Sequence, residues 1–369
     1  MNKKFVIVDA ANLVHRAKHV AHRGDIDMRI GMALHITFNG LRKAWRDLGG
    51  DHIVFCLEGT SWRKHVYDDY KANRIVAKLK KTRRELEDDE LFFEAFDDLN
   101  AFIKEKTNCT VLQCPIAEAD DLIATWIDLH PASQHIIVSS DTDFIQLLSD
   151  RVEIYNPIAN VRLTSDGIFD DKNNRLEFRL KSDGKIKVGG KNPSFKAERD
   201  DWIQFATFLK CIRGDKTDNI YPAYPGARIK GSKNKTGITE AWDDRDSGGF
   251  SWNNFMLQTW TDPDGVEHTV RDRYEINRML IDLHEQPDDV KEEVIECIVK
   301  EVETERKSNV GIHFMKFCSK WDLKRISQYP DEFATMLNAH YNDHLLALEK
   351  RIEEVRSGSV DLLDWRDLN

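Results

Sequence analysis

Short apolar runs alternate with longer helical patterns through the first 150 residues. Three runs, Lys4 to Val8, His52 to Leu57 and His135 to Val138, have the nearly continuous apolar character of strands that are covered on both faces. Between them, Met28 to Leu48 and Leu86 to Lys106 carry apolar residues at helical spacing. Strands and helices that alternate at these lengths predict an α/β fold with a central, mainly parallel, right-handed sheet flanked by helices.

The pattern changes after residue 150. Val152 to Val188 is rich in β-forming residues and carries two Ser-Asp-Gly turn signals, and Trp202 to Ile212 is a second apolar helix. An irregular insert follows Ile238, and two further helical stretches are expected from Arg271 to about Arg306 and from Gly311 to about Arg356. We therefore expect a core over residues 1–150, a β-rich excursion over 151–200, a helical region over 201–356 and a tail over 357–369.

Acidic residues follow each of the three predicted strands of the core. Asp9 ends the first strand, Glu58 follows the second, and Asp141 and Asp143 follow the third. Parallel strands deliver their carboxyl ends to one edge of a sheet, which is where open α/β sheets bind ligands.

Three more acids, Glu118, Asp120 and Asp121, open a helical pattern that leads directly into the third strand. Carboxylates gathered in this way repel one another, and a hard divalent cation such as Mg²⁺ or Mn²⁺ is the ligand that neutralises them best. The sequence thus indicates a metal site at the carboxyl edge of the sheet.

Each acidic group also has an ordinary structural explanation. Asp9 can cap the helix that follows it, either Asp120 or Asp121 can cap the next one, and the Asp141 and Asp143 pair can form a solvated turn. The arrival of all these acids at the same sheet edge is much less expected by chance than any one of them.

Composition places few limits on the function. The chain has 369 residues, of which 41% are hydrophobic and 32% charged, and no apolar run approaches the roughly 20 residues of a membrane span. The amino terminus has no signal-peptide pattern, so we expect a cytoplasmic protein without membrane contact, in the host cytoplasm if the protein is viral. Six cysteines without CxxC spacing argue against zinc.

The formal net charge of -10 hides a strongly basic segment between Arg63 and Arg84. A basic run of this density, with Trp62, Tyr67 and Tyr70 interleaved, is typical of a surface that binds a phosphate backbone. The alternatives are a solvated helix face and aromatic residues that simply pack. A second basic stretch, a loop rich in glycine and proline, contains Arg228, Lys230, Lys233 and Lys235.

Five motifs, in this order, resemble those of the 5′-nuclease superfamily, which has a PIN-like fold and includes flap endonucleases, the 5′-nuclease domain of DNA polymerase I and phage 5′-3′ exonucleases or ribonucleases H. The motifs are Val8-Asp9-Ala10-Ala11-Asn12-Leu13, Trp62-Arg63 with Tyr70-Lys71-Ala72-Asn73-Arg74, Glu118-Ala119-Asp120-Asp121, Ser139-Ser140-Asp141-Thr142-Asp143 and Gly214-Asp215-Lys216-Thr217-Asp218-Asn219-Ile220. The resemblance extends from residue 5 to about 235, and the later helices are similar to those of phage members.

The resemblance implies a metal-dependent 5′ nuclease of replication or repair, with two divalent ions. One ion would be held by Asp9, Glu58, Glu118 and Asp120, and the other by Asp120 or Asp121 with Asp141, Asp143, Asp215 and Asp218. Lys71 and Arg74 match the family's basic pair near the scissile phosphate.

The resemblance also implies how the substrate is held. A helical arch at about residues 63–90 would admit a free 5′ end, and a helix-hairpin-helix-like loop would hold duplex DNA, with a monovalent cation such as K⁺. The implied nucleic-acid contacts are Arg16, Arg63, Lys78, Lys80, Lys81, Arg83, Arg84, Arg228, Lys230, Lys233 and Lys235. RNA/DNA hybrids and replication proteins are further expected partners.

Two departures from the family pattern are visible. Glu58 stands where most members have Asp, with a short link to Arg63, and the basic loop from Pro225 to Gly237 is longer than usual. The main alternative is a non-catalytic nucleic-acid binding protein of the same fold, although such proteins lose acids and this chain retains nearly all of them. An α/β phosphatase would need a second acid two residues after Asp9, where the chain has Ala11.

Overall fold

The computed structural model describes residues 3–21, 24–181, 184–188, 199–233, 235–262, 265–302 and 304–341. The expected tail over residues 357–369, the helix end predicted near Arg356 and the turn at Ser182 and Asp183 lie outside these residues.

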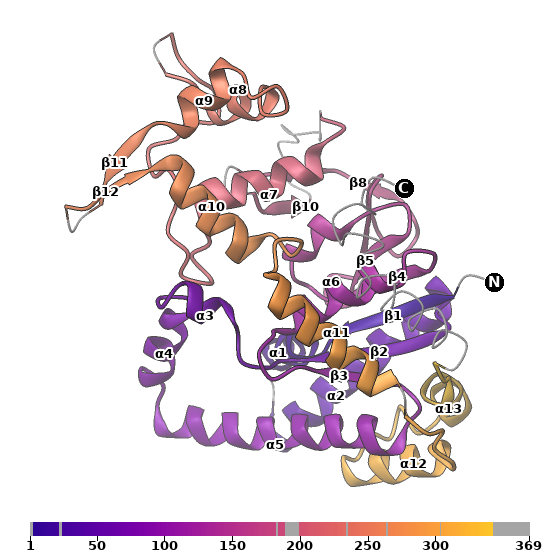
Figure 1. Cartoon of the computed structure of the whole chain (residues 1–369). Coiled ribbons are helices and arrows are strands. Elements are labelled where there is room, and N and C mark those ends of the chain that lie inside the picture. Colours follow the sequence, from indigo (N-terminus) through magenta and orange to yellow (C-terminus); the bar gives the residue numbers. More distant parts are fainter. Residues whose placement is uncertain are drawn as a thin grey trace.

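One eight-stranded sheet forms the centre of the molecule, in the order β3-β2-β1-β4-β5-β6-β7-β8 (Figure 1). The first five strands in this order are parallel, and the pairs from β5 to β8 are antiparallel. The strands are β1 (Lys4–Asp9), β2 (His52–Leu57), β3 (Thr110–Gln113), β4 (Gln134–Val138), β5 (Val152–Asn156), β6 (Val161–Thr164), β7 (Gly167–Phe169) and β8 (Arg175–Leu176). The carboxyl ends of β1, β2 and β4 therefore lie at one edge.

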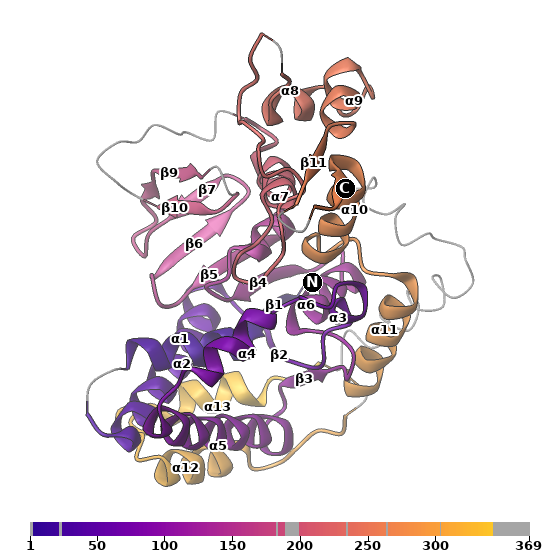
Figure 2. The same ribbon diagram turned by 90° about the vertical axis from the view of Figure 1, so that its left-hand side faces the viewer.

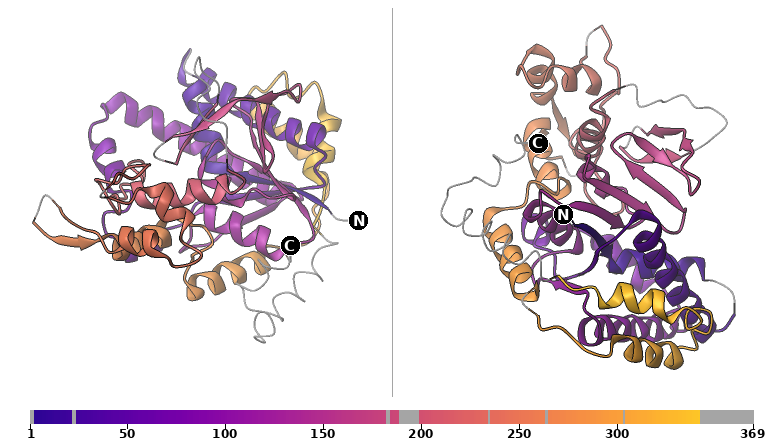
Figure 3. Two further views of the ribbon diagram at one scale, coloured as in Figure 1. Left: turned by 90° about the horizontal axis from the view of Figure 1, so that it is seen from above. Right: turned by 90° about the vertical axis from the view of Figure 1, so that its right-hand side faces the viewer.

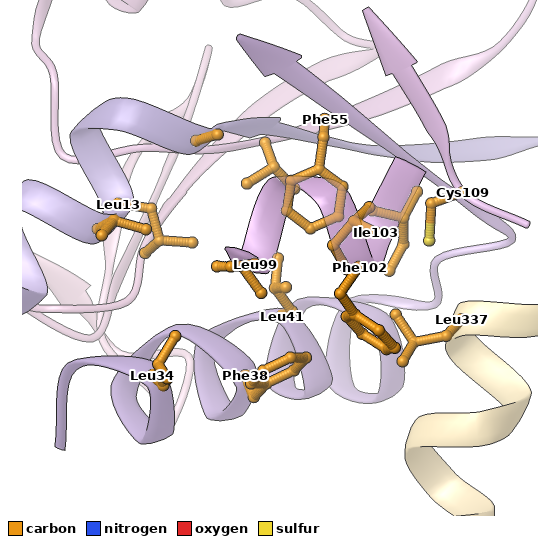
Figure 4. Close-up of a cluster of buried hydrophobic side chains, with 14 of the residues drawn as sticks. Leu13, Leu34, Phe38, Leu41, Phe55, Leu99, Phe102, Ile103, Cys109 and Leu337 are labelled. Carbon is orange, nitrogen blue, oxygen red and sulfur yellow. The ribbon is translucent and has the colours of Figure 1, made fainter. Parts of the chain in front are cut away.

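Helices cover both faces of the parallel part of the sheet. One face packs against α1 (Ala10–Val20), α2 (Ile26–Leu48), α5 (Arg83–Lys106), α12 (Val310–Lys320) and α13 (Pro330–Asn338), and Figure 4 shows this apolar layer with Phe38, Phe55 and Phe102 among its members. The other face packs against α6 (Ala119–Leu129) and α11 (Asp288–Val302). Two buried layers of this kind explain why the core strands are apolar on both faces.

Between β2 and the long helix α5, the chain leaves the core and returns as an open arch (Figure 1). The arch consists of α3 (Arg63–Val66), α4 (Ala72–Leu79) and the first part of α5, which begins with a capping box between Thr82 and Glu85. None of the residues of α4 is buried.

A second region stands above the carboxyl edge. It contains α7 (Trp202–Arg213), α8 (Ile238–Asp243), α9 (Phe250–Met256), α10 (Val270–Ile281) and two hairpins, β9 (Phe178–Leu180) with β10 (Ile186–Val188) and β11 (Thr259–Thr261) with β12 (Glu267–Thr269). Figure 2 shows β9 and β10 next to β7, and Figure 3 shows that the β11–β12 hairpin points away from the central sheet.

The last described residues pack at the opposite, amino edge of the sheet. The hydroxyl of Tyr341 lies 2.8 Å from Nε2 of the buried His130. The centre of the Tyr341 ring lies 5.4 Å from that of Trp126 and 6.2 Å from that of Phe5, near the start of β1. This contact places the end of the described chain beside its beginning.

The α/β class and the parallel core sheet are confirmed, with three differences. The short strand β3 was not predicted, and residues 152–176 extend the central sheet instead of forming a separate excursion. Helices α11 to α13, expected in one helical region with α7 to α10, instead pack on the faces of the core. No helix in the described part of the chain combines the length and apolar character that a membrane span requires.

Candidate active site

A cavity of about 790 Å³ opens at the carboxyl edge of the sheet, between the arch and the region above. Eight of the nine acids predicted as metal ligands line it, and they come from five separate segments of the chain. They are Asp9, Glu58, Glu118, Asp120, Asp141, Asp143, Asp215 and Asp218. The structure thus brings together, on one floor, the acids that follow β1, β2 and β4, those at the start of α6 and those of the loop after α7.

Asp9 is both a helix cap and part of this floor. Its side chain accepts a hydrogen bond from the backbone N–H of Asn12, at 3.1 Å, as the N-cap of α1, and another from the hydroxyl of Ser139 at 2.9 Å. The side chain also faces the cavity. The cap explanation considered for this residue is therefore correct and does not exclude a role in the site.

Three acids of the floor, Asp9, Asp120 and Asp141, hold their protons more tightly than free aspartates do. Burial and the charge of Glu58 raise the pKa of Asp9 from its ordinary value of 3.8 to about 7. Burial and the charge of Asp143 raise the pKa of Asp141 to about 6, and burial and Asp9 raise the pKa of Asp120 well above its usual range. Carboxylates that repel one another in this way bind a divalent cation favourably.

Asp121 does not belong to the cavity, contrary to the prediction that it shares the second ion. Its carboxylate is fully buried and accepts hydrogen bonds from both terminal nitrogens of Arg63, at 2.9 and 2.8 Å, and from Nε1 of Trp62 at 3.2 Å. It also accepts from the backbone N–H of Glu118, which completes a capping box at the start of α6. Asp121 therefore anchors α6 to the foot of the arch.

Arg63 is correspondingly not a nucleic-acid contact. Only 1% of this residue is exposed, and its Nε donates to the backbone carbonyl of Leu280 in α10 at 2.9 Å. Trp62 is 4% exposed, so the packing explanation holds for it. The basic run thus has a buried first residue, Arg63, a mostly buried Lys71, and an otherwise exposed remainder.

The foot of the arch lies against the acidic floor. Lys71 forms an ion pair with Glu118, and the hydroxyl of Tyr70 donates to the same carboxylate at 2.8 Å. Although burial alone would lower the pKa of Lys71, the charge of Glu118 raises it, so the ammonium stays protonated. The backbone of Lys71 adopts a left-handed conformation, with φ of 56°, which is uncommon for a residue with a side chain and is typical of functional sites.

A second set of contacts joins the arch to the loop that follows α7. The backbone N–H of Lys71 donates to the carbonyl of Asp218 at 2.8 Å, and the guanidinium of Arg74 pairs with the Asp218 carboxylate at 2.9 Å. The amide of Asn73 donates to the carbonyls of Lys216 and Thr217, at 3.0 and 3.1 Å. These contacts fix Lys71 and Arg74, the predicted catalytic pair, at the wall of the cavity.

Lys210 contacts two of the floor acids, and the sequence reasoning missed it. It lies in the apolar helix α7, almost fully buried, and its Nζ is 2.5 Å from Asp143 and 2.9 Å from Asp215. Burial alone would lower the pKa of Lys210, but the charges of these two acids raise it. Burial would in turn raise the pKa of Asp215, but the ammonium of Lys210 lowers it to about 2. A single lysine on the buried face of an apolar helix is the signal that could have identified it.

The other predicted nucleic-acid contacts lie on the exposed rim. Arg16 lines the cavity from α1. The arch exposes Lys78, Lys80, Lys81, Arg83 and Arg84, and the loop between α7 and α8 exposes Arg228, Lys230, Lys233 and Lys235. Of the arch residues, Lys81 pairs with Asp89 and Arg83 with Glu87.

The loop between α7 and α8 is fixed by one carboxylate. Glu240, in the first turn of α8, accepts hydrogen bonds from the backbone N–H of Gly231, at 3.0 and 2.9 Å, and of Gly237 at 3.1 Å. A Cβ atom at either glycine would come within 2.6 Å of neighbouring backbone. The loop lies between α7 and α8, and α8 occupies the start of the stretch where an irregular insert was expected. The loop lies outside the set of residues that line the cavity.

The donor atoms on the cavity floor suit a hard divalent cation. All eight side chains are carboxylates, which Mg²⁺ and Mn²⁺ prefer over nitrogen and sulfur ligands. Within the described residues, no three acidic, imidazole or thiol side chains converge on one point closely enough to hold an ion as they stand. The lysine ammoniums instead occupy positions between acids, Lys210 between Asp143 and Asp215 and Lys71 beside Glu118.

Comparisons with known proteins agree with this architecture. Residues 4–174 match the family described as 5′-3′ exonuclease, N-terminal resolvase-like domain. The chain is similar to the flap endonucleases Xni of Shewanella loihica, with 32% identity over 165 residues, and of Psychromonas ingrahamii, with 32% identity over 168 residues. The matches cover 44% and 43% of this chain and 58% and 59% of these relatives, so they span less than two thirds of the relatives' length.

A solved structure extends the likeness in fold to most of the chain. The flap endonuclease of bacteriophage T5, in a pseudo-enzyme-product complex with DNA and metal ions, aligns with a TM-score of 0.51 and 17% identity. The alignment covers 87% of this chain and 100% of the T5 chain. The expected central sheet with flanking helices is thereby confirmed.

Proposed function

We propose that the chain is a member of the 5′-nuclease superfamily, as its similarity to the 5′-3′ exonuclease N-terminal domain and to flap endonucleases Xni suggests, and that it is a structure-specific 5′ nuclease that hydrolyses phosphodiester bonds with the help of divalent metal ions. The observation that carries this proposal is the cavity in which eight carboxylates from five chain segments lie beneath a basic arch. The acids are retained, which favours an enzyme over a non-catalytic nucleic-acid binding protein of the same fold.

Two sets of residues would hold two Mg²⁺ or Mn²⁺ ions. Asp9, Glu58, Glu118 and Asp120 would form the first set, and Asp120, Asp141, Asp143, Asp215 and Asp218 the second. When bound, such ions supply an activated water and neutralise the charge that develops on the leaving oxygen. Asp121 is excluded from both sets because Arg63 and Trp62 use both of its oxygens.

The basic residues of the chain would bind and orient the substrate. Lys71 and Arg74 stand at the cavity wall above Glu118 and Asp218, where their charges would stabilise the scissile phosphate in the transition state. Tyr70 holds Glu118 through its hydroxyl and so fixes the carboxylate that Lys71 contacts. The products would carry a 5′-phosphate and a 3′-hydroxyl.

We further infer the course of the DNA across the protein. The single-stranded 5′ end would pass the exposed lysines and arginines of the arch, and the duplex would lie along the loop of Arg228, Lys230, Lys233 and Lys235. A monovalent cation such as K⁺ would bind at this loop. We further propose that the protein also acts on RNA primers in RNA/DNA hybrids. It would contact replication proteins in the cytoplasm, or in the cytoplasm of the host if the protein is viral.

Cleavage of 5′-labelled substrates tests the function directly. A 5′ flap, a nicked duplex, a blunt duplex and an RNA-primed duplex are incubated with the protein in Mg²⁺, in Mn²⁺ and in EDTA. We expect short 5′ fragments from the flap with either metal and none in EDTA. Tight binding of all four substrates without any cleavage would instead identify the protein as the non-catalytic alternative.

A further inference from the structure

The β9–β10 hairpin, to which the sequence analysis assigned no function, contributes to the wall of the cavity. Lys181 directly follows β9 and Lys185 directly precedes β10, and both of these lysines line the cavity together with the carboxylates of the floor. The arch and α1 line other parts of the same cavity with Lys71, Arg74 and Arg16. The hairpin therefore adds a third basic wall.

The hairpin is firmly seated on the region above the sheet. Leu180 is 8% exposed and Ile186 is partly buried, and both pack in the apolar cluster that includes Phe205 and Ala206 of α7. The backbone N–H of Lys181 donates to the carbonyl of Lys185 at 2.8 Å. The apolar contacts of both strands and this hydrogen bond fix the backbone of Lys181 and Lys185 relative to α7.

Gly184 permits the closest approach of the turn to α7. Its φ is +78°, and a Cβ atom there would lie 2.6 Å from the carbonyl oxygen of Ala206 and 3.0 Å from the backbone nitrogen of Lys210. Both the backbone conformation and the lack of space require glycine at this position. The turn is thus held directly beside the helical residue that pairs with Asp143 and Asp215.

Lys185 lies where the rim meets the acidic floor. Its Nζ is 3.6 Å from the Asp215 carboxylate and 3.2 Å from the hydroxyl of Thr217, and 36% of its side chain is exposed. Asp215 is already neutralised by the closer ammonium of Lys210 at 2.9 Å. A partly exposed ion pair at 3.6 Å adds little stability.

We propose that the β9–β10 hairpin is a substrate-binding element, in which Lys185, assisted by Lys181, contacts a backbone phosphate of the nucleic acid in the cavity, on the side of the cavity where Asp215 and Thr217 lie. The proposal rests on the proposed nuclease function. A phosphate that enters beside Asp215 meets the ammonium of Lys185 from this wall and those of Lys71 and Arg74 from the arch. The substrate strand is thereby held between two basic walls over the carboxylates.

Binding and cleavage are measured separately to test the hairpin. A fluorescent flap DNA is titrated with the wild type, Lys185→Ala and Lys185→Arg in Ca²⁺, over a series of salt concentrations, and cleavage in Mg²⁺ is assayed in parallel. For Lys185→Ala we expect affinity to fall about fivefold to tenfold, because one charged contact is lost. The slope of log affinity against log salt should become shallower by about 0.7 to 0.9. Lys185→Arg should retain both values.

Two further variants separate the hairpin from general effects. Lys172→Ala removes an exposed lysine of the β7–β8 turn, which does not line the cavity, and should bind like the wild type. Gly184→Ala keeps every charge but pushes the turn away from α7, and it should weaken binding as Lys185→Ala does. Circular dichroism checks that each variant is folded.

The outcomes distinguish this inference from the nuclease proposal. If the wild type cleaves the flap but Lys185→Ala binds with unchanged affinity and salt slope, Lys185 is only an ion-pair partner of Asp215 and the hairpin proposal is wrong. If the wild type binds but never cleaves, the nuclease proposal fails, while the salt slopes still decide whether the hairpin contacts DNA.

Discussion

The floor and the rim of the cavity are built in opposite ways. Six of the eight floor carboxylates follow the ends of buried strands or open α6, so the core fixes their positions, and Asp215 and Asp218 join them from the loop after α7. The rim consists of lysines and arginines on the arch and the β9–β10 hairpin, and further exposed basic residues lie outside the cavity on the loop between α7 and α8. The floor is positioned by packing and the rim by a few backbone and side-chain contacts.

This difference shows why the overall charge is a poor guide to the function. The formal net charge of -10 would suggest repulsion of nucleic acid, yet the basic residues are concentrated where a phosphate backbone would pass. The acids nearest to them face the cavity, where Lys71 pairs with Glu118 and Lys210 with Asp215. Changes to the floor should therefore abolish chemistry, whereas changes to the rim should weaken binding in small steps.

Loss of one floor carboxylate should give the largest effect. Asp141→Ala removes a proposed ligand of the second ion, and we expect the rate of flap cleavage to fall about a thousandfold or more, because the ions supply both the nucleophile and the charge stabilisation. Single-turnover cleavage in Mg²⁺ measures this effect. Asp171→Ala, which removes an exposed acid outside the cavity, serves as the control. A variant Asp141→Ala that cleaves as fast as the wild type would remove Asp141 from the site.

Loss of the buried ion pair between Arg63 and Asp121 should affect the stability of the protein more than the chemistry of the cavity. Arg63→Met leaves the buried carboxylate of Asp121 without its partner, and we expect the free energy of unfolding to fall by about 3 to 5 kcal/mol. Urea denaturation measures the change. Arg84→Met, on the exposed arch, should change stability by less than about 0.5 kcal/mol. Equal effects of the two substitutions would contradict the division into buried floor and exposed rim.

The raised pKa values of Asp9 and Asp141, about 7 and about 6, predict how metal-free protein responds to pH. Since the folded protein holds these protons more tightly than the unfolded chain, the acids lower stability as pH rises from about 4 to about 7. In EDTA, Asp9→Asn should therefore be more stable than the wild type at pH 8, by about 1 to 3 kcal/mol, and this advantage should vanish at pH 4.

Mg²⁺ should remove the advantage of Asp9→Asn at pH 8, because the ion stabilises the ionised carboxylates of the wild type. Thermal unfolding of the wild type and Asp9→Asn at pH 4, 6 and 8, with and without Mg²⁺, measures both the pH dependence of the stability difference and its removal by the ion. A wild type that Mg²⁺ does not stabilise at pH 8 would argue against a metal site on this floor.

A single exposed lysine of the rim should give the smallest effect. Lys235→Ala in the loop between α7 and α8 should weaken binding of duplex DNA about twofold to fivefold and reduce the salt slope by about 0.9, with the rate of bound-substrate cleavage unchanged. Fluorescence anisotropy and single-turnover cleavage separate the two quantities. A large loss of the cleavage rate with unchanged affinity would place this loop in the chemistry instead.

The sequence was sufficient for the parts of the site that depend on local pattern. Strand ends and helix starts follow from hydrophobic periodicity, so the meeting of Asp9, Glu58 and Asp141 at one edge could be predicted. Asp120 and Asp121 show where local pattern is insufficient. Neighbouring residues point about 100° apart on a helix, and only the packing of α6 decides that Asp120 faces the cavity and Asp121 faces Arg63.

The residues that were wrongly assigned or missed depend on contacts between distant segments. Arg63 is buried because its partners lie on α6 and α10, far away in the sequence. Lys210 meets Asp143 only when α7 packs over the carboxyl edge. Lys185 reaches the cavity because Gly184 lets the turn approach α7. Hydrophobic periodicity marks Lys210 as a lysine on a buried helix face, but it does not identify the distant partners of Arg63, Lys210 or Lys185.

The packing of Tyr341 beside Phe5 and His130 has a practical consequence for experiments on single molecules. Tyr341 and Phe5 lie at the amino edge of the sheet, a full strand length from the cavity at the carboxyl edge. A tether or fluorophore attached near Lys3, at the start of β1, would therefore hold the protein by the side that faces away from its substrate. An immobilised enzyme should keep its arch and cavity open to DNA in solution.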